Sequence, residues 1–181
     1  SSDLDLLYTT CGKTSSFPSE ICTFCLNFSD FIMQISEAVF AEKRHIMIYG
    51  IGCDLCDTAR MAKSLGGPHG STFAARVFGP AEREALGLSE GNSSPLSAHK
   101  AASAAADFAA KEAFLKAAGT GLAGPFALCE IEAVRLESGA PEYRFSGGSA
   151  QWMDEHHLRA KLSLSHDGGM ALAFCILETE T

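Results

Sequence analysis

The longest regular pattern in the chain is an alanine-rich stretch, residues 97–118, in which charged and aromatic side chains recur at helical spacing. Alanine has the highest helix propensity of all residues, and Gly119 stands where a glycine commonly ends a helix. We therefore predict one long helix from Ser97 to Ala118. The other predicted elements are shorter, so this helix is the element around which we expect the chain to be arranged.

Alternation of apolar and polar residues predicts strands before and after this helix. In the strand predicted at Ile46–Leu55, Gly50, Gly52 and Asp54 share the face opposite the larger apolar side chains. Two hairpins follow the helix, and the second turns at Asp167-Gly168, a dipeptide typical of tight turns. The strands predicted in these hairpins are Phe126–Leu136, Glu142–Ser146, Ala160–His166 and Met170–Leu177.

Shorter helices are predicted from apolar residues at helical spacing and from glycine and proline at their ends. They cover Thr58–Leu65, Phe73–Phe78, Pro80–Leu86 and Gly147–Leu158. Near the start of the chain, residues 29–43 form an amphipathic pattern that also fits a helix. A loop rich in glycine and serine, Gly87–Ser97, leads into the long helix.

Length, composition and charge are those of an ordinary globular domain. With 181 residues, 46% of them hydrophobic and 20% charged, the chain is long enough for one domain with a sizeable core. No apolar run reaches the length of a membrane span, and Asp3 and Asp5 stand where a signal peptide would carry basic residues. The net charge of −8 argues against general binding of nucleic acid.

The cysteines allow two interpretations. Seven is an odd number and several lie in apolar stretches, so we expect reduced, buried thiols in a cytoplasmic protein. Alternatively, Cys22-x-x-Cys25 and Cys53-x-x-Cys56 together supply four zinc ligands. Cys53 lies in a predicted strand, however, where residues three apart face opposite sides. Reduced thiols are therefore the simpler interpretation.

Within the long helix, Phe108, Glu112 and Lys116 are four residues apart and lie along one face. Taken alone, a Glu–Lys pair at this spacing is the ordinary solvated pair of a helix surface. Two further stretches, Gly50–Leu55 and Leu162–Asp167, change this interpretation. In chain order, the motifs G-I-G-x-D, F-A-A-K-E-A-F-x-K-A-x-G-T-G and L-S-x-S-H resemble holo-acyl-carrier-protein synthase, the small bacterial type of 4′-phosphopantetheinyl transferase.

The resemblance covers about Met47–Glu178 and implies an α+β fold, in which a long helix packs on a small antiparallel sheet. Members of this family usually begin near the position of Met47, so we expect a transferase domain at 47–181 and an extension of unknown role at 1–46. The activity implied is transfer of 4′-phosphopantetheine from coenzyme A to a serine of apo-acyl carrier protein, with release of 3′,5′-ADP, for fatty acid biosynthesis. The alternative is a non-catalytic module of the same fold that binds coenzyme A or a carrier protein.

The resemblance assigns catalytic roles to three residues. Asp54 and Glu112 would bind Mg²⁺, which prefers hard oxygen ligands and keeps waters and substrate phosphates in its shell. Either Glu112, or a metal-bound water held by Asp54, would be the base for the serine hydroxyl. Lys116 would stabilise the leaving phosphate. As a lone feature, an Asp at a strand end is more often the ordinary N-cap of a following helix.

The coenzyme A site implied by the resemblance draws on more distant parts of the chain. The turn Gly119-Thr120-Gly121 would line the cleft, Ser165-His166 would meet the nucleotide end, and Lys111 would meet a phosphate. Each has a plainer interpretation, because a glycine turn also caps a helix and a histidine beside a turn is often structural. Asp107 departs from the pattern, since many members carry a basic residue there, and one nucleotide phosphate contact is therefore in doubt.

Residues 59–81 carry a positive charge within an otherwise acidic chain. They contain Arg60, Lys63 and Arg76 and no acidic residue. Arg60 and Lys63 are three apart and share a helix face. A solvated surface is the usual interpretation of such a charge run. An acidic enzyme that docks an acidic carrier protein nevertheless needs a basic surface of this kind. The resemblance also implies a homotrimer with active sites between subunits.

Overall fold

The structure, a computed structural model, describes residues 46–88 and 96–180. It divides the chain into two units, Ser1–Arg44 and His45–Thr181, and the second contains all the described residues. The helix predicted at 29–43 lies outside the described residues.

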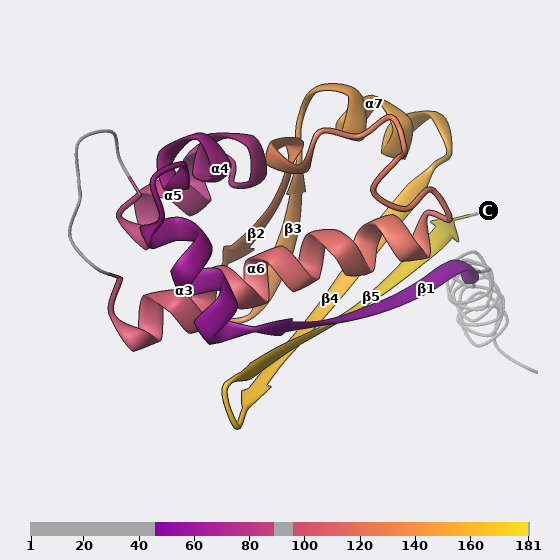
Figure 1. Cartoon of the computed structure of the whole chain (residues 1–181). Helices are drawn as coiled ribbons and strands as arrows, with labels where there is room; N and C mark the ends of the chain where they lie inside the picture. Colours follow the sequence, from indigo (N-terminus) through magenta and orange to yellow (C-terminus); the bar gives the residue numbers. More distant parts are fainter. Residues whose placement is uncertain (1–45, 89–95, 181) are drawn as a thin grey trace, which may run out of the picture. The chain divides into compact units, whose positions relative to one another are not determined.

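Three strands form an antiparallel sheet in the order β1-β5-β4 (Figure 1). The strands are β1 (Ile46–Asp57), β4 (Leu158–Asp167) and β5 (Met170–Glu180). The predicted hairpin is confirmed, because β4 and β5 pair directly on either side of a turn at Gly168 and Gly169. β1 pairs with the other edge of β5, so β1 and β4 are the two outer strands.

Helix α6 (Ala98–Ala117) agrees with the predicted long helix and packs on β1 and β5 (Figure 1). Two glycines of β1 allow a close approach. A Cβ placed on Gly52 would lie 1.9 Å from the carbonyl oxygen of Ala113, and one on Gly50 would lie 1.9 Å from that of Ala117. Helix and strand therefore meet backbone to backbone, which fixes their relative position.

A separate two-stranded hairpin packs beside α6 and consists of β2 (Ile131–Arg135) and β3 (Pro141–Phe145). The longer strand predicted at Phe126–Leu136 is wrong in its first half. Residues Leu128–Glu130 form a short 3₁₀ helix, η1, and the ring of Phe126 packs 5.7 Å from that of Phe114. An apolar run does not by itself distinguish a strand from a connecting segment that is anchored in the core.

Four short helices complete the described part of the chain: α3 (Thr58–Gly66), α4 (Gly70–Val77), α5 (Pro80–Leu86) and α7 (Gly147–Glu155). α3 and α5 agree closely with the prediction, whereas α4 begins earlier than the predicted Phe73. A Cβ on Gly70 would lie 1.9 Å from the carbonyl oxygen of Leu65, so only glycine permits this tight entry into α4. Within residues 46–88 and 96–180, no helix combines the length and apolar character that crossing a membrane requires.

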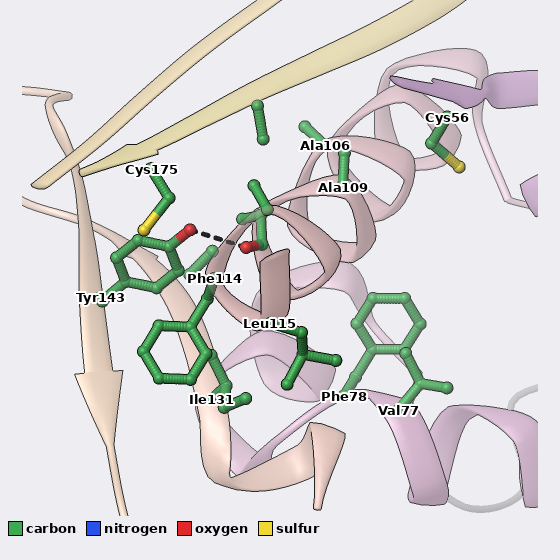
Figure 2. Packing of buried hydrophobic residues seen from close by; sticks show 14 of the residues in the cluster. Cys56, Val77, Phe78, Ala106, Ala109, Phe114, Leu115, Ile131, Tyr143 and Cys175 are labelled. Carbon is green, nitrogen blue, oxygen red and sulfur yellow. Dashed lines mark hydrogen bonds between the residues drawn. The ribbon is translucent and has the colours of Figure 1, made fainter. Parts of the chain in front are cut away.

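The core lies where α6 meets the sheet and the β2–β3 hairpin, and Phe114 is at its centre (Figure 2). Four aromatic rings surround that of Phe114 at centroid distances of 4.9 to 6.2 Å: Phe126, Tyr143, Phe145 and Trp152. The Tyr143 hydroxyl donates a hydrogen bond of 2.6 Å to the carbonyl oxygen of Ala110, which ties β3 to α6 (Figure 2).

Candidate active site

Strand β1 and helix α6 bring a carboxylate and an ammonium together. Asp54 lies on the face of β1 that also carries Gly52 and the buried Cys56, so its side chain is directed toward α6. The Nζ of Lys116, in the last turn of α6, donates to Oδ1 of Asp54 at 2.8 Å and to the carbonyl oxygen of Cys53 at 2.9 Å. The pair is open to solvent, because the Asp54 side chain is 19% exposed and that of Lys116 is 49% exposed.

Glu112 lies one turn before Lys116 on the same face of α6 and is partly buried. Burial raises the pKa of Glu112 above its ordinary value, and the negative charge of Asp54 raises it further. The positive charges of Lys116 and Arg60 act on this pKa in the opposite direction. A hydrogen bond to Asp54 in turn raises the pKa of Lys116. The structure therefore brings Asp54, Glu112 and Lys116 into one cluster, which we call the carboxylate cluster.

The carboxylate cluster has the chemistry of a site for a small divalent cation. Its two carboxylates come from different elements and repel each other, and Asp54 already holds a positive group, the Lys116 ammonium. An ion such as Mg²⁺ fits this pair, because it binds through one or two carboxylates and keeps waters and phosphate oxygens in its shell. Among residues 46–88 and 96–180, no group of three or more His, Cys, Asp or Glu side chains could hold a metal ion. A cation here would thus complete its shell from water and ligand.

The turn that follows α6 is open on its outer side. Gly119 and Gly121 have φ angles of +73° and +61°, in the left-handed region that favours glycine. No atom of the described residues lies within 4 Å of a Cβ placed on either glycine, so backbone conformation, not crowding, requires glycine there. The amides of Thr120 and Gly121 donate to the carbonyl oxygen of Leu115 at 3.1 and 3.2 Å, which closes the helix end. The turn thus begins just beyond Lys116, beside the carboxylate cluster.

Ser165 and His166 lie away from the carboxylate cluster within one chain. Both are exposed at the end of β4, next to the turn into β5. Ser165 pairs with Leu172, and Leu172 pairs with Leu55 of β1. With about 4.8 Å between neighbouring strands, about 10 Å of sheet separates the two edges. The sequence motif that contains Ser165 and His166 therefore does not join Asp54 in a single chain.

Lys111 cannot reach a ligand, so the expectation that it meets a phosphate is wrong for this chain. Its side chain is fully buried, and its Nζ lies 2.7 and 2.8 Å from the two carboxylate oxygens of Glu82. It donates a further hydrogen bond to the carbonyl oxygen of Ile131. Burial lowers the pKa of Lys111 and raises the pKa of Glu82 to about 7, and the partner's charge offsets part of each change.

Glu82 is a residue that the sequence analysis missed. Besides Lys111, its carboxylate accepts hydrogen bonds of 2.8 Å from the backbone amides of Gly79 and Ala133. The only local signal was its place three residues after Gly79, where a carboxylate can cap a helix. The Glu82–Lys111 pair joins α5, α6 and β2, so it holds α6 in the orientation that directs Glu112 toward Asp54.

Asp107, which departs from the family pattern, is buried and forms an ion pair of 2.9 Å with Arg135. Burial raises the pKa of Asp107, and the Arg135 guanidinium opposes this change. A positive group therefore lies beside position 107 in this chain as well. It is the guanidinium of Arg135 on β2, whereas many relatives carry a basic residue at position 107 itself, on α6.

The predicted basic residues are exposed on two short helices that follow β1. Arg60 and Lys63 belong to α3, and Arg76 lies in the last turn of α4. Asp57, at the end of β1, caps α3 by accepting a hydrogen bond of 2.8 Å from the amide of Arg60. α3 therefore begins four residues after Asp54, and the charge of Arg60 in its first turn acts on Glu112 of the carboxylate cluster.

Cys53 and Cys56 face opposite sides of β1, because Cys53 is exposed and Cys56 is buried. Their thiols are not directed at a common ion. Cys22 and Cys25, the other half of the zinc interpretation, lie outside the described residues.

Comparison with known proteins gives a consistent result. A profile of the 4′-phosphopantetheinyl transferase superfamily matches residues 50–175. The holo-[acyl-carrier-protein] synthase of Methylobacterium radiotolerans is 42% identical over 137 residues, which cover 73% of this chain and 94% of the relative. The solved structure of the Neisseria meningitidis holo-[acyl-carrier-protein] synthase is 33% identical, with a TM-score of 0.60 and coverage of 74% of this chain and 100% of that one. The Bacillus anthracis synthase, solved in complex with coenzyme A (3′,5′-ADP), is 29% identical, with a TM-score of 0.57 and coverage of 74% and 99%.

The α+β fold, with one long helix on a small antiparallel sheet, is that of a phosphopantetheinyl transferase. The matched residues make up more than half of the chain and include the whole carboxylate cluster. The chain therefore belongs to the 4′-phosphopantetheinyl transferase superfamily. Within that superfamily it is similar to holo-[acyl-carrier-protein] synthases.

Proposed function

We propose that this protein is a Mg²⁺-dependent holo-[acyl-carrier-protein] synthase of the cytoplasm that serves fatty acid biosynthesis. It transfers the 4′-phosphopantetheine group from coenzyme A to a serine of apo-acyl carrier protein, and 3′,5′-ADP leaves. The observation that carries this proposal is the convergence of Asp54, Glu112 and Lys116 in a chain of this superfamily.

Each residue of the carboxylate cluster has a separate task in this proposal. Asp54 and Glu112 hold Mg²⁺, which when bound neutralises charge on the pyrophosphate of coenzyme A. Glu112, or a metal-bound water held by Asp54, would also accept the proton of the carrier serine. The flexible, half-exposed ammonium of Lys116 stabilises the negative charge that develops on the leaving phosphate.

Coenzyme A would lie along the open turn Gly119-Thr120-Gly121, next to Lys116. Since Ser165 and His166 are at the opposite edge of the sheet, we infer that they serve the site of a neighbouring chain in a homotrimer. The outer face of the sheet supports self-association, because apolar side chains gather there without cover in the described structure. These side chains, each between 40% and 54% exposed, are Ile51, Leu55, Leu172 and Phe174.

The acidic carrier protein would dock on the basic side chains of α3 and α4, Arg60, Lys63 and Arg76. The charge of Arg60 acts on Glu112, which supports an approach of the carrier serine from the side of α3. The rest of the chain is acidic and would repel such a partner, which favours this orientation.

Intact mass spectrometry of an apo carrier protein, incubated with the 181-residue chain, coenzyme A and Mg²⁺, tests the proposal. The carrier should gain the mass of one phosphopantetheine. Asp54→Asn and Glu112→Gln should each lower the rate about 100-fold or more, because each removes one carboxylate from the metal site and the second also removes the base. Thermal unfolding should change far less than the rate, since both side chains are partly exposed.

Glu142→Gln is the matched control, because it makes the same change at an exposed position of β3. It should leave the rate unchanged. Binding of coenzyme A without any gain of mass on the carrier would overturn the proposal in favour of a non-catalytic binding module. Near-normal rates in either carboxylate variant would overturn the assignment of the site.

A further inference from the structure

The Lys116 ammonium is bound to the carboxylate of Asp54, one of the two carboxylates that would hold a cation. Its Nζ is held by two acceptors, Oδ1 of Asp54 at 2.8 Å and the carbonyl oxygen of Cys53 at 2.9 Å. Both acceptors belong to β1, whereas Lys116 belongs to α6. The contact therefore also bridges the two elements that carry the carboxylates.

A lysine ammonium and a divalent ion cannot share this carboxylate without cost. Both are positive, and at contact distance like charges repel appreciably even in a partly solvated site. The side chain of Lys116 is long, flexible and 49% exposed, so it can swing away without disturbing the core. Lys111, in contrast, is fully buried on Glu82 and cannot take part in such an exchange.

We propose that Lys116 is an internal counter-ion, which a divalent cation must displace from Asp54 before the site is complete. The displaced ammonium loses the Asp54 carboxylate as its partner, and an added negative ligand would give it a new one. A phosphate of the substrate is such a ligand, and this second step rests on the function proposed above. The cation therefore binds weakly to the protein alone. It binds more tightly once a phosphate oxygen accepts a hydrogen bond from the Lys116 ammonium.

Titration of the full-length protein with Mn²⁺, with free Mn²⁺ read by electron paramagnetic resonance, tests the displacement directly. Lys116→Met removes the ammonium and keeps a side chain of similar length. It should lower the Kd for Mn²⁺ by about 1.5- to 5-fold, the range that an exposed ion pair is typically worth. Lys116→Arg keeps the positive charge and should leave the Kd close to that of the wild type.

Lys100→Met is the matched control, because it makes the same substitution in the first turn of the same helix, about 24 Å from Lys116 along the axis. It should leave the Kd for Mn²⁺ unchanged. Near-ultraviolet circular dichroism of each variant should show the same aromatic core signal as the wild type.

Three outcomes would overturn the proposal. The first is that Lys116→Met binds Mn²⁺ no more tightly than the wild type, and the second is that Lys100→Met tightens binding as much as Lys116→Met. The third is that no variant binds Mn²⁺ at millimolar concentration. The titration contains neither coenzyme A nor carrier protein, so it is independent of the transfer reaction. A protein that shows the displacement but no transfer would contradict only the proposed function.

Discussion

Glu112 illustrates how neighbouring charges set the chemistry of one side chain. Its pKa is raised by burial and by the charge of Asp54, and it is lowered by the charge of Lys116. A carboxylate with a raised pKa stays protonated to higher pH than an ordinary glutamate, so it becomes a competent base only above that pH. Without a cation, Glu112 is therefore expected to become fully charged only above the usual range of a glutamate, and a cation bound to its carboxylate would lower this pKa again.

Titration of Glu112 in the metal-free protein should separate the effects of the Asp54 and Lys116 charges on its pKa. Asp54→Asn removes the negative charge and should lower the pKa of Glu112. Lys116→Met removes a positive charge and should raise it, and burial is the same in both variants. Carbon-13 NMR of the Glu112 carboxyl group as a function of pH measures both shifts. Shifts of the same sign in the two variants would contradict the assigned causes.

At the scale of elements, the contact between β1 and α6 positions the carboxylate cluster. Gly52 lies directly against the helix backbone, with 1.9 Å between a placed Cβ and the carbonyl oxygen of Ala113. Gly52→Ala would force the strand and the helix apart, and overpacking of this kind costs about 1–3 kcal/mol. The free energy of unfolding, from denaturant titration, should fall by that amount. Transfer should fall as well, because Asp54 moves away from Glu112.

The matched control for this contact is Gly66→Ala at the end of α3, where no atom of residues 46–88 or 96–180 lies within 4 Å of the added Cβ. Gly66→Ala should leave the free energy of unfolding unchanged or raise it slightly, because alanine restricts the conformations of the unfolded chain. If Gly52→Ala is tolerated as well as Gly66→Ala, close backbone contact is not what positions the cluster.

Helix α3 is the element that we expect to recognise the carrier protein. Reversal of Arg60 and Lys63 to glutamate should raise the KM for the carrier about tenfold and leave coenzyme A binding nearly intact. The KM of the wild type should also rise with salt, because exposed charges are screened. Reversal of Lys100 and Arg144, which are exposed on α6 and β3, is the control for net charge. An equal rise in KM in both double variants would exclude α3 as the docking surface.

At the scale of the whole molecule, the apolar outer face of the sheet predicts assembly. Leu172 on this face is 41% exposed, and Leu136, at the end of β2, is 48% exposed. Leu172→Asp should convert a trimer into monomers in analytical ultracentrifugation, whereas Leu136→Asp should not. A wild-type protein that sediments as a monomer would rule out the shared site.

Assembly also predicts complementation between two inactive proteins. Asp54→Asn and His166→Ala remove residues at opposite edges of the sheet. If each site takes Asp54 from one chain and His166 from its neighbour, a mixed trimer contains some sites with both residues intact. Subunit exchange should therefore restore part of the transfer activity. No recovery in demonstrably mixed trimers would place both residues in the site of one chain.

Local patterns in the sequence were sufficient to predict the main helices and strands. The alanine-rich helix ending before Gly119 is α6, and the hairpin at Asp167-Gly168 is β4 and β5. Four-residue spacing correctly placed Glu112 and Lys116 on one face of the helix. These features depend on backbone propensities and on neighbours a few residues away, so they can be read without knowledge of the packing.

Only the tertiary structure decided which polar residues are exposed and which are buried. Lys111 has the sequence context of a site residue, yet it is paired in the core with Glu82, 29 residues earlier in the chain. Phe126 has the context of a strand residue, yet its ring packs against Phe114 and Trp152. Burial and charge pairing depend on partners that are distant in sequence, and folding alone brings those partners together. The motifs likewise indicated Asp54, Glu112 and Lys116 through the family resemblance, whereas only the folded structure shows that Lys116 donates to Asp54.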